Sequence, residues 1–169
     1  MTEQEKREIV RQSFGYCCAY CGVHENEVGS ELELDHFHPR AAGGSDDLEN
    51  LVYCCPACNR IKSDFWPSDP TVRRLLHPQR DVIAEHFRED TDGRLIALTQ
   101  TGAFYIERLR LNRPPLIALR QARAERISLR LEVNELRVAQ AKLQEQLVAR
   151  DEQINEIVAQ LNRLLSNNG

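Results

Sequence analysis

Two Cys-x-x-Cys pairs constrain the fold of this chain more than any other feature. Cys18 and Cys21 form the first pair, and Cys55 and Cys58 form the second. Two intervening residues let both thiolates of a pair reach one tetrahedral ion at about 2.3 Å, and two such pairs are typical of a zinc site. Four thiolates close the coordination sphere to substrate, so we expect Zn²⁺ with a structural role. The metal would let a unit with a small core fold.

The remaining cysteines, Cys17 and Cys54, offer an alternative choice of ligands. Using them would leave three intervening residues rather than two, so we interpret both as small buried hydrophobic residues. A redox role for either Cys-x-x-Cys pair is the competing interpretation. No thioredoxin-like pattern surrounds them, which favours zinc.

Periodicity and capping signals predict an α+β arrangement around the cysteines. A capping box at the start of the chain predicts a helix over residues 3–13. Alternating polar and apolar residues over 30–37 predict a strand, and residues 51–53 predict a second short one. A helix then opens at Pro56, because proline is favoured in the first helical turn. The expected order is strand, loop, strand, helix.

The chain changes composition after Pro115, from where glycine and proline are absent until Gly169. Nine of eleven heptad a and d positions between 129 and 164 are apolar, and the exceptions are Gln140 and Arg150. The repeat predicts a long helix that forms a coiled coil. A single helix that folds back on the head is the alternative.

We therefore expect three regions. Residues 1–66 form a small zinc-clamped head, and residues 114–166 form the coiled-coil helix. Residues 67–113 form an accessory region with a hairpin that turns near Asp92-Gly93 and a short helix.

Charge and hydropathy exclude some classes of protein. The net charge of −4 argues against a protein that coats nucleic acid nonspecifically. Arginine supplies 19 of the 22 basic residues, an excess that genome composition bias explains in large part. No apolar run approaches the roughly 20 residues that span a bilayer, and the charged N-terminus lacks the apolar core of a secretory signal. We expect a cytoplasmic protein, where disulfides are disfavoured.

Four polar residues stand where the zinc would display them: Asp35, His36, Asn50 and Asn59. Singly, each has an ordinary structural interpretation, such as a polar strand end, a turn or a helix cap. Together they lie within "CAYCG…LDHFHPRAAGGSDDLENLVYCCPACNRIKSD", which resembles the zinc-bound form of the HNH (ββα-metal) endonuclease family. The resemblance covers about residues 16–64 and leaves the hairpin region and the long helix uncovered.

The resemblance implies a role for each of the four residues. His36 matches the general base, and Asp35 matches a metal ligand. Asn50 matches the residue that braces the loop and the histidine, and Asn59 matches the second metal ligand. The family often has histidine at the last position. Carboxylate and amide oxygens favour Mg²⁺, with Mn²⁺ acceptable, so asparagine there narrows the choice of catalytic metal.

Other polar residues are candidates for contacts with nucleic acid. Arg40 and Lys62 are expected to contact phosphates, and His38 lies on the same strand face as His36. Seven arginines over residues 108–130 form either a DNA-facing stripe or the solvated face of a helix. His24, His77 and His86 have no chemical companions in the sequence and are expected to be structural or exposed.

The sequence thus predicts a metal-dependent HNH endonuclease that cuts DNA to leave 5′-phosphate and 3′-hydroxyl ends. A homodimer formed through the coil would bring two heads together for the two strands of a duplex if the coil is parallel, and would place them far apart if it is antiparallel. Two alternatives stay open: a zinc-dependent DNA-binding module without catalysis, and a subunit of a larger defence, phage or mobile-element complex recruited through the coil. The sequence alone leaves the substrate open between duplex, branched or single-stranded DNA and RNA.

Overall fold

A computed structural model describes residues 2–69 and 73–166, with the side chain of Leu165 left out. The chain forms two compact units, of which the first ends at Gln121 and the second begins at Ala122. Each unit is described by itself.

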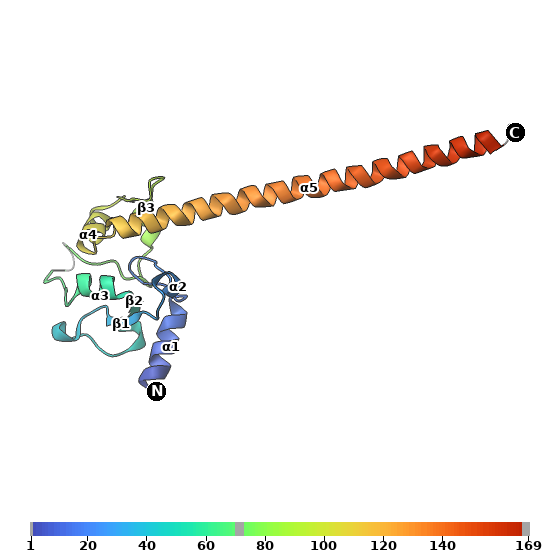
Figure 1. Cartoon of the computed structure of the whole chain (residues 1–169). Helices are drawn as coiled ribbons and strands as arrows, with labels where there is room; N and C mark the ends of the chain where they lie inside the picture. Colours follow the sequence, from blue (N-terminus) through green and yellow to red (C-terminus); the bar gives the residue numbers. More distant parts are fainter. Residues whose placement is uncertain (1, 70–72, 167–169) are drawn as a thin grey trace. The chain divides into compact units, whose positions relative to one another are not determined.

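The first unit begins with two helices (Figure 1). Helix α1 spans Glu3–Ser13 and starts with the predicted capping box, in which Thr2 and Glu5 exchange side-chain-to-backbone hydrogen bonds. A one-turn helix, α2, spans Glu25–Val28. The N-terminal helix was predicted, whereas α2 was not, because four residues carry too little periodicity to be recognised.

A two-stranded antiparallel sheet and a helix follow. Strand β1 (Glu33–His36) pairs with β2 (Leu51–Cys54), with Asp35 opposite Val52. Helix α3 spans Pro56–Lys62 and packs against β1. The predicted order of strand, loop, strand and helix is confirmed, as is the α+β class. Short 3₁₀ turns lie in the loops of the unit, at Arg40–Ala42, Leu48–Asn50 and Ile83–Glu85.

The rest of the first unit carries the predicted hairpin and short helix. Strands β3 (Phe87–Glu89) and β4 (Leu95–Ala97) pair around Gly93, whose φ of +77° suits a residue without a Cβ. Helix α4 (Gln100–Arg108) is capped by the Thr99 hydroxyl, which accepts a hydrogen bond from the amide of Gly102.

One core serves the whole first unit. Many of its fully buried side chains come from β2 and from the region after α4, including Val52, Tyr53, Leu109 and Leu111. Arg108 also donates hydrogen bonds to the carbonyls of Ile61 and Lys62, which occupy the last turn of α3. The accessory region predicted at 67–113 therefore shares its packing with the cysteine-containing head.

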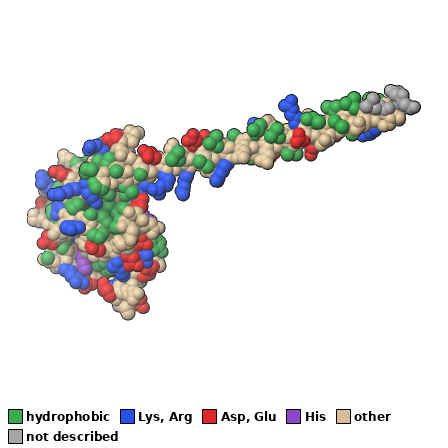
Figure 2. Space-filling view, in the orientation of Figure 1, with side chains coloured by type: hydrophobic (Ala, Val, Ile, Leu, Met, Phe, Trp, Pro, Cys, Tyr) green, Lys and Arg blue, Asp and Glu red, His purple; other side chains and the backbone are tan. Residues whose placement is uncertain are grey.

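The second unit is the part of helix α5 (Pro114–Ser166) that follows Gln121. Figure 2 shows hydrophobic side chains distributed along it. Heptad side chains such as Leu136, Leu143 and Leu164 are each more than half exposed. The long helix is confirmed, and the coiled coil stays a prediction. Among the described residues, no helix is apolar enough over its length to cross a membrane.

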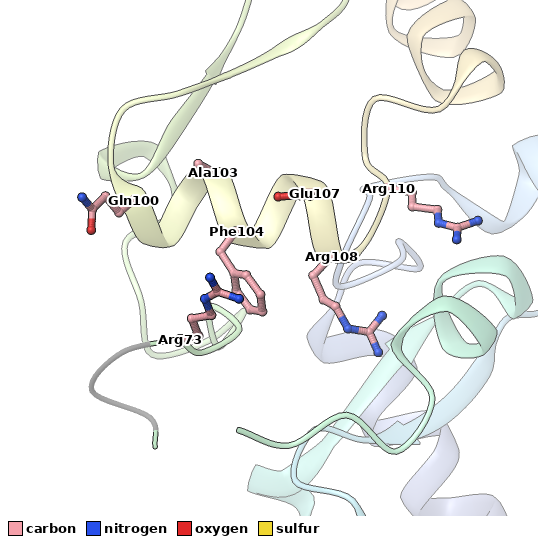
Figure 3. Close-up of a pocket in the computed structure, with 7 residues that line it drawn as sticks. All are labelled: Arg73, Gln100, Ala103, Phe104, Glu107, Arg108 and Arg110. Atoms are coloured by element: carbon pink, nitrogen blue, oxygen red, sulfur yellow. The ribbon is translucent and has the colours of Figure 1, made fainter. Parts of the chain in front are cut away.

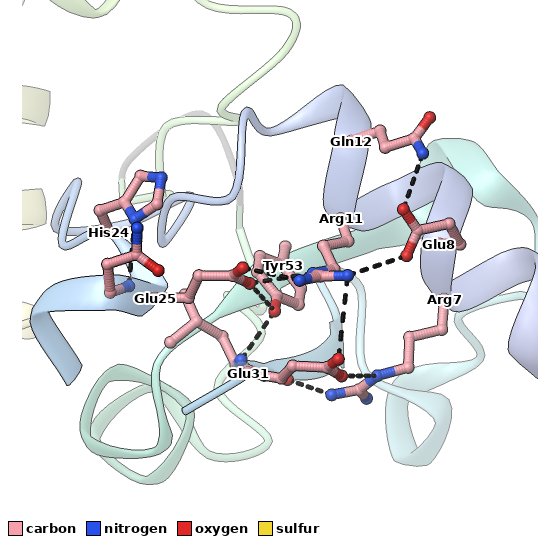
Figure 4. Close-up of polar contacts among 10 residues, drawn as sticks. Arg7, Glu8, Arg11, Gln12, His24, Glu25, Glu31 and Tyr53 are labelled. Carbon is pink, nitrogen blue, oxygen red and sulfur yellow. Dashed lines mark hydrogen bonds and ion pairs between the residues drawn. The ribbon is translucent and has the colours of Figure 1, made fainter. Parts of the chain in front are cut away.

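A polar chain attaches α1 to the sheet (Figure 4). The Arg11 guanidinium donates two hydrogen bonds to the Glu25 carboxylate, at 2.9 and 2.6 Å. The hydroxyl of Tyr53 donates to the same carboxylate at 2.9 Å and accepts from the amide of Leu32. The hydrogen bonds from Arg11, and then that from Tyr53, lower the pKa of Glu25 to about 2.

Replacing Glu25 by glutamine is expected to lower the free energy of unfolding at neutral pH. The native carboxylate stays ionised down to about pH 2, whereas the ordinary pKa of a glutamate side chain is 4.5. The wild type's advantage should therefore be complete above pH 4.5 and disappear as pH falls toward 2. Urea denaturation of both proteins across this range, followed by circular dichroism, measures the difference, and Glu89→Gln serves as the exposed control. A difference that does not vary with pH would contradict the assignment.

Candidate metal centre and nuclease site

Four cysteine sulfurs converge in the first unit. The Sγ atoms of Cys18, Cys21, Cys55 and Cys58 all lie within 4.8 Å of one another. Four sulfurs bound to one tetrahedral zinc ion at about 2.3 Å would lie roughly 3.8 Å apart. The Sγ atoms of Cys21 and Cys55 are 3.8 Å apart. Both the ligand type and the spacing fit Zn²⁺, and the ligand set is the one predicted from the sequence.

The local backbone explains why the thiolates converge. The amide of Gly22 donates to the Cys18 carbonyl, and its φ of +70° closes the first turn. In the second turn, Cys55 is the N-cap of α3, and its Sγ accepts a hydrogen bond from the amide of Cys58 at 3.4 Å. Arg113 donates to the Sγ of Cys58, also at 3.4 Å. The negative charge of four thiolates exceeds the positive charge of one zinc ion, so the guanidinium of Arg113 would stabilise the centre.

The remaining cysteines differ in environment. Cys54 is fully buried, and burial raises the pKa of its thiol, so it remains protonated and packs as a small hydrophobic residue. Cys17 is half-buried and forms a β-bridge with His24. Neither belongs to the sulfur cluster.

The Asp35 carboxylate lies between β1 and α3 and is mostly buried, with 11 % of its side chain exposed. It accepts a hydrogen bond from the hydroxyl of Tyr20 at 2.7 Å and pairs with the Lys62 ammonium at 3.0 Å. Lys62 is fully buried, and its ammonium also donates to the carbonyls of His36 and Ser63. This environment argues against the predicted phosphate contact of Lys62, because its charge is already neutralised and has no access to solvent.

Asn59 lies one turn before Lys62 on the same helix. Its Nδ2 donates to the Glu33 carboxylate at 2.8 Å. Glu33 and Asp35 are two positions apart on β1 and therefore share one face of the strand. The Glu33 carboxylate thus contacts the predicted second ligand on α3, and oxygen donors suit a hard divalent cation. Glu33 was not predicted, although its alternation with Asp35 was the available signal.

His36 faces away from Asp35, as neighbouring strand residues do. Its Nε2 lies 2.7 Å from Oδ1 of Asp46, and the Arg40 Nε donates to the same oxygen at 2.7 Å. The hydrogen bonds to His36 and then Arg40 lower the pKa of Asp46, so the group is a carboxylate and accepts both. Nε2 of His36 therefore donates this hydrogen bond, which leaves Nδ1 as the ring nitrogen that is not bonded to Asp46. Asp46 was not predicted, because two adjacent acids in a loop do not reveal which one contacts His36.

Asn50 holds the loop between His38 and Ser45. Its Oδ1 accepts from the amide of His38, while its Nδ2 donates to the carbonyls of His38 and Ser45. At Gly44 a Cβ would lie 1.8 Å from the His38 carbonyl oxygen, so only glycine fits that close approach. The amide of Phe37 also donates to the Asn50 carbonyl, which ties the loop to the strand end.

The other histidines have structural surroundings. The His38 ring stacks on Trp66 with centroids 3.9 Å apart, and its Nε2 donates to the Ala42 carbonyl. His24 caps α2. His77 is buried, which lowers its pKa. His86 hydrogen-bonds the Thr99 hydroxyl.

Comparison with known proteins agrees with this geometry. The model of the HNH endonuclease family matches residues 18–65, a segment that includes both cysteine pairs, β1, β2 and α3. The chain therefore contains an HNH endonuclease domain, and the match supports nuclease activity. A comparison with curated proteins gave no match. The roles of Asp35, His36, Asn50 and Asn59 remain predictions that the geometry makes specific.

Replacing a zinc ligand should have a much larger effect than replacing a neighbouring cysteine. Cys58→Ser is expected to abolish zinc binding and unfold the first unit, because structural zinc contributes about 10 kcal/mol or more to small domains. Cys17→Ser should retain one zinc ion per chain and the wild-type circular dichroism spectrum. Zinc content by elemental analysis checks both. Loss of zinc in Cys17→Ser, or full retention in Cys58→Ser, would contradict the ligand set.

Proposed function

We propose that this protein is a metal-dependent endonuclease that hydrolyses phosphodiester bonds in DNA, with His36 as the general base and one divalent cation. The observation that carries the proposal is the match to the HNH family over the segment in which Asp35 and His36 end β1 and which contains the four-cysteine cluster. Cleavage would leave 5′-phosphate and 3′-hydroxyl ends, as in the family.

The hydrogen bond of His36 identifies the nitrogen that would accept the proton. Asp46 accepts from Nε2, so Nδ1 is the basic atom available to a water molecule. The carboxylate also fixes the ring orientation and stabilises the imidazolium that forms after proton transfer. Arg40 holds Asp46 in turn, although its own side chain remains 66 % exposed. Asp46 is thus a positioning residue for the base.

Oxygen donors on the other face of β1 and on α3 would together hold the cation. Asp35 and Asn59 are the proposed ligands, and Mg²⁺ or Mn²⁺ fits their hard oxygen atoms. When bound, such a cation stabilises the charge that develops on the phosphate and the leaving oxygen. Tyr20 and Lys62 keep the Asp35 carboxylate in place. Asn50 braces the loop that follows the base, and Arg40 and His38 are proposed contacts for substrate phosphates.

The test is conversion of supercoiled plasmid into nicked and linear forms by zinc-loaded protein with added Mg²⁺ or Mn²⁺. Wild type should cut, and His36→Ala should cut about 10²- to 10⁴-fold more slowly, which is the usual contribution of a general base. Asp46→Asn should also cut more slowly, because a neutral amide at position 46 no longer offers a carboxylate to orient the His36 ring. His86→Ala is the control. Equal cutting by wild type and His36→Ala, with full zinc content in both, would refute the role of His36.

We also propose that α5 pairs with a second copy of the chain as a parallel coiled coil. Its unpartnered a and d side chains, such as Leu143 and Leu147, are more than half exposed. With d at position 129, Glu125 and Glu132 fall at g, opposite Arg130 and Arg137 at e of a parallel second copy. Opposite charges at these positions favour that orientation, which would place the two heads at the same end of the coil. Two heads would then cut both strands of a duplex.

A seam substitution separates this homodimer from recruitment by another protein. Leu143→Arg, at a d position, should convert a dimer into a monomer and shift plasmid products from linear to nicked. Leu131→Arg is the matched control, because Leu131 is equally exposed but lies at f, outside the seam. Sedimentation equilibrium measures the mass, and zinc content confirms the fold. A monomeric wild type would instead favour recruitment into a larger complex through the coil.

A further inference from the structure

A groove of about 900 Å³ opens on one side of α4, outside the segment that the family model covers. Arg73, Phe104, Arg108 and Arg110 line it together with Gln100 and Glu107 (Figure 3). Figure 3 shows Phe104 and Arg108 extending from the same side of α4. Three guanidinium groups and one carboxylate give this groove a positive balance.

Two of the three arginines form no ion pair with any residue that the structure describes. Arg108 is engaged with the carbonyls of α3 and lies over the Phe65 ring, 4.7 Å from its centroid. Arg73 and Arg110 are exposed, and within residues 2–69 and 73–166 neither forms an ion pair. Exposed arginines that line a concave surface and form no ion pair with a carboxylate suit the phosphates of a polyanion.

Aromatic rings connect the groove to the candidate nuclease site. The Phe104 ring lies under the Arg73 guanidinium and 5.7 Å from the Phe65 ring. A second hollow, of about 450 Å³, continues past Arg73, Phe104 and Phe65 to Trp66. Trp66 is 40 % exposed, and its ring stacks on His38, two residues after His36. The two hollows share Arg73 and Phe104, so aromatic and guanidinium groups line a surface that reaches the ring of His38, two residues after the proposed base.

We propose that this surface, formed by Trp66, Phe104, Arg73 and Arg110, binds an unpaired strand of nucleic acid next to the bond that is cut. The inference rests on the proposed nuclease function and names the form of its substrate. Bases stack on the exposed parts of Trp66 and Phe104, while Arg73 and Arg110 contact phosphates. Aromatic faces are accessible only to bases that have left a duplex stack, so a single-stranded or locally opened segment fits better than a closed duplex.

The chain has a single tryptophan, so its fluorescence reports on this surface directly. Zinc-loaded protein without added Mg²⁺ is titrated with an oligothymidine of a dozen nucleotides and with a duplex of the same length. The single strand should quench Trp66 and bind more tightly than the duplex. Phe104→Ala should weaken binding about tenfold. Arg73→Ala and Arg110→Ala should each weaken it and lower the slope of log Kd against log salt by about 0.7.

The controls separate this surface from the catalytic site. Arg88→Ala removes a guanidinium that is 56 % exposed and lies outside the groove, and it should bind as wild type does. His36→Ala should also bind normally. If wild type cuts plasmid but the oligonucleotide leaves Trp66 fluorescence unchanged, the groove assignment fails while the nuclease stands. Tighter binding of duplex, or unchanged affinity in both arginine variants, would overturn the proposal as well. Normal quenching without cleavage would support the groove and count against the nuclease.

Discussion

The convergence of four cysteine sulfurs is the constraint on which the first unit depends. The zinc they are suited to bind would tie the turn at residues 18–21 to the first turn of α3, and because Cys55 caps that helix, its position and rotation would be fixed together. Asn59 directly follows Cys58, the last of the four cysteines. Zinc binding would therefore also fix which side of α3 faces β1. Two arginines from the later part of the chain add to this support. Arg113 donates a hydrogen bond to the Sγ of Cys58, and Arg108 donates one to the carbonyl of Lys62 at the end of α3.

The two faces of strand β1 carry different candidate groups: the proposed metal ligand lies on one face and the proposed base on the other. Glu33 and Asp35 face α3, where Asn59 and the buried Lys62 lie, while His36 faces the loop that carries Asp46. Burying an ammonium is costly unless it is paired, and Lys62 meets that requirement with one carboxylate and two carbonyls. The arrangement holds Asp35 rigid without using any group that the proposed base needs. A metal ligand and a base can therefore be adjacent in sequence and remain chemically independent.

The features that could be predicted are those written in short-range patterns. The cysteine spacing identified the ligand set, the capping box located α1, and the heptad repeat identified the long helix. Three contacts could not be predicted: the ion pair of Lys62 with Asp35, the hydrogen bond between Asp46 and His36, and the stacking of Trp66 on His38. Each joins residues 10 to 28 positions apart and depends on how the loops close. Lys62 shows the limit most clearly: its type suggested phosphate binding, and only its burial shows that its charge serves the fold. The contact between the rings of Phe104 and Phe65 could not be predicted either, because it depends on how α4 packs in the fold.

Binding of Mn²⁺ to the zinc-loaded protein tests most directly whether this framework builds a one-metal nuclease site. Electron paramagnetic resonance of Mn²⁺ counts bound ions without any need for cleavage. Wild type should bind one Mn²⁺ per chain, Asn59→Ala should lose it, and Asn26→Ala, which changes an amide outside the site, should retain it. Mn²⁺ binding that survives in Asn59→Ala, or no binding by wild type with its zinc in place, would contradict the assignment of Asp35 and Asn59 as the catalytic metal ligands.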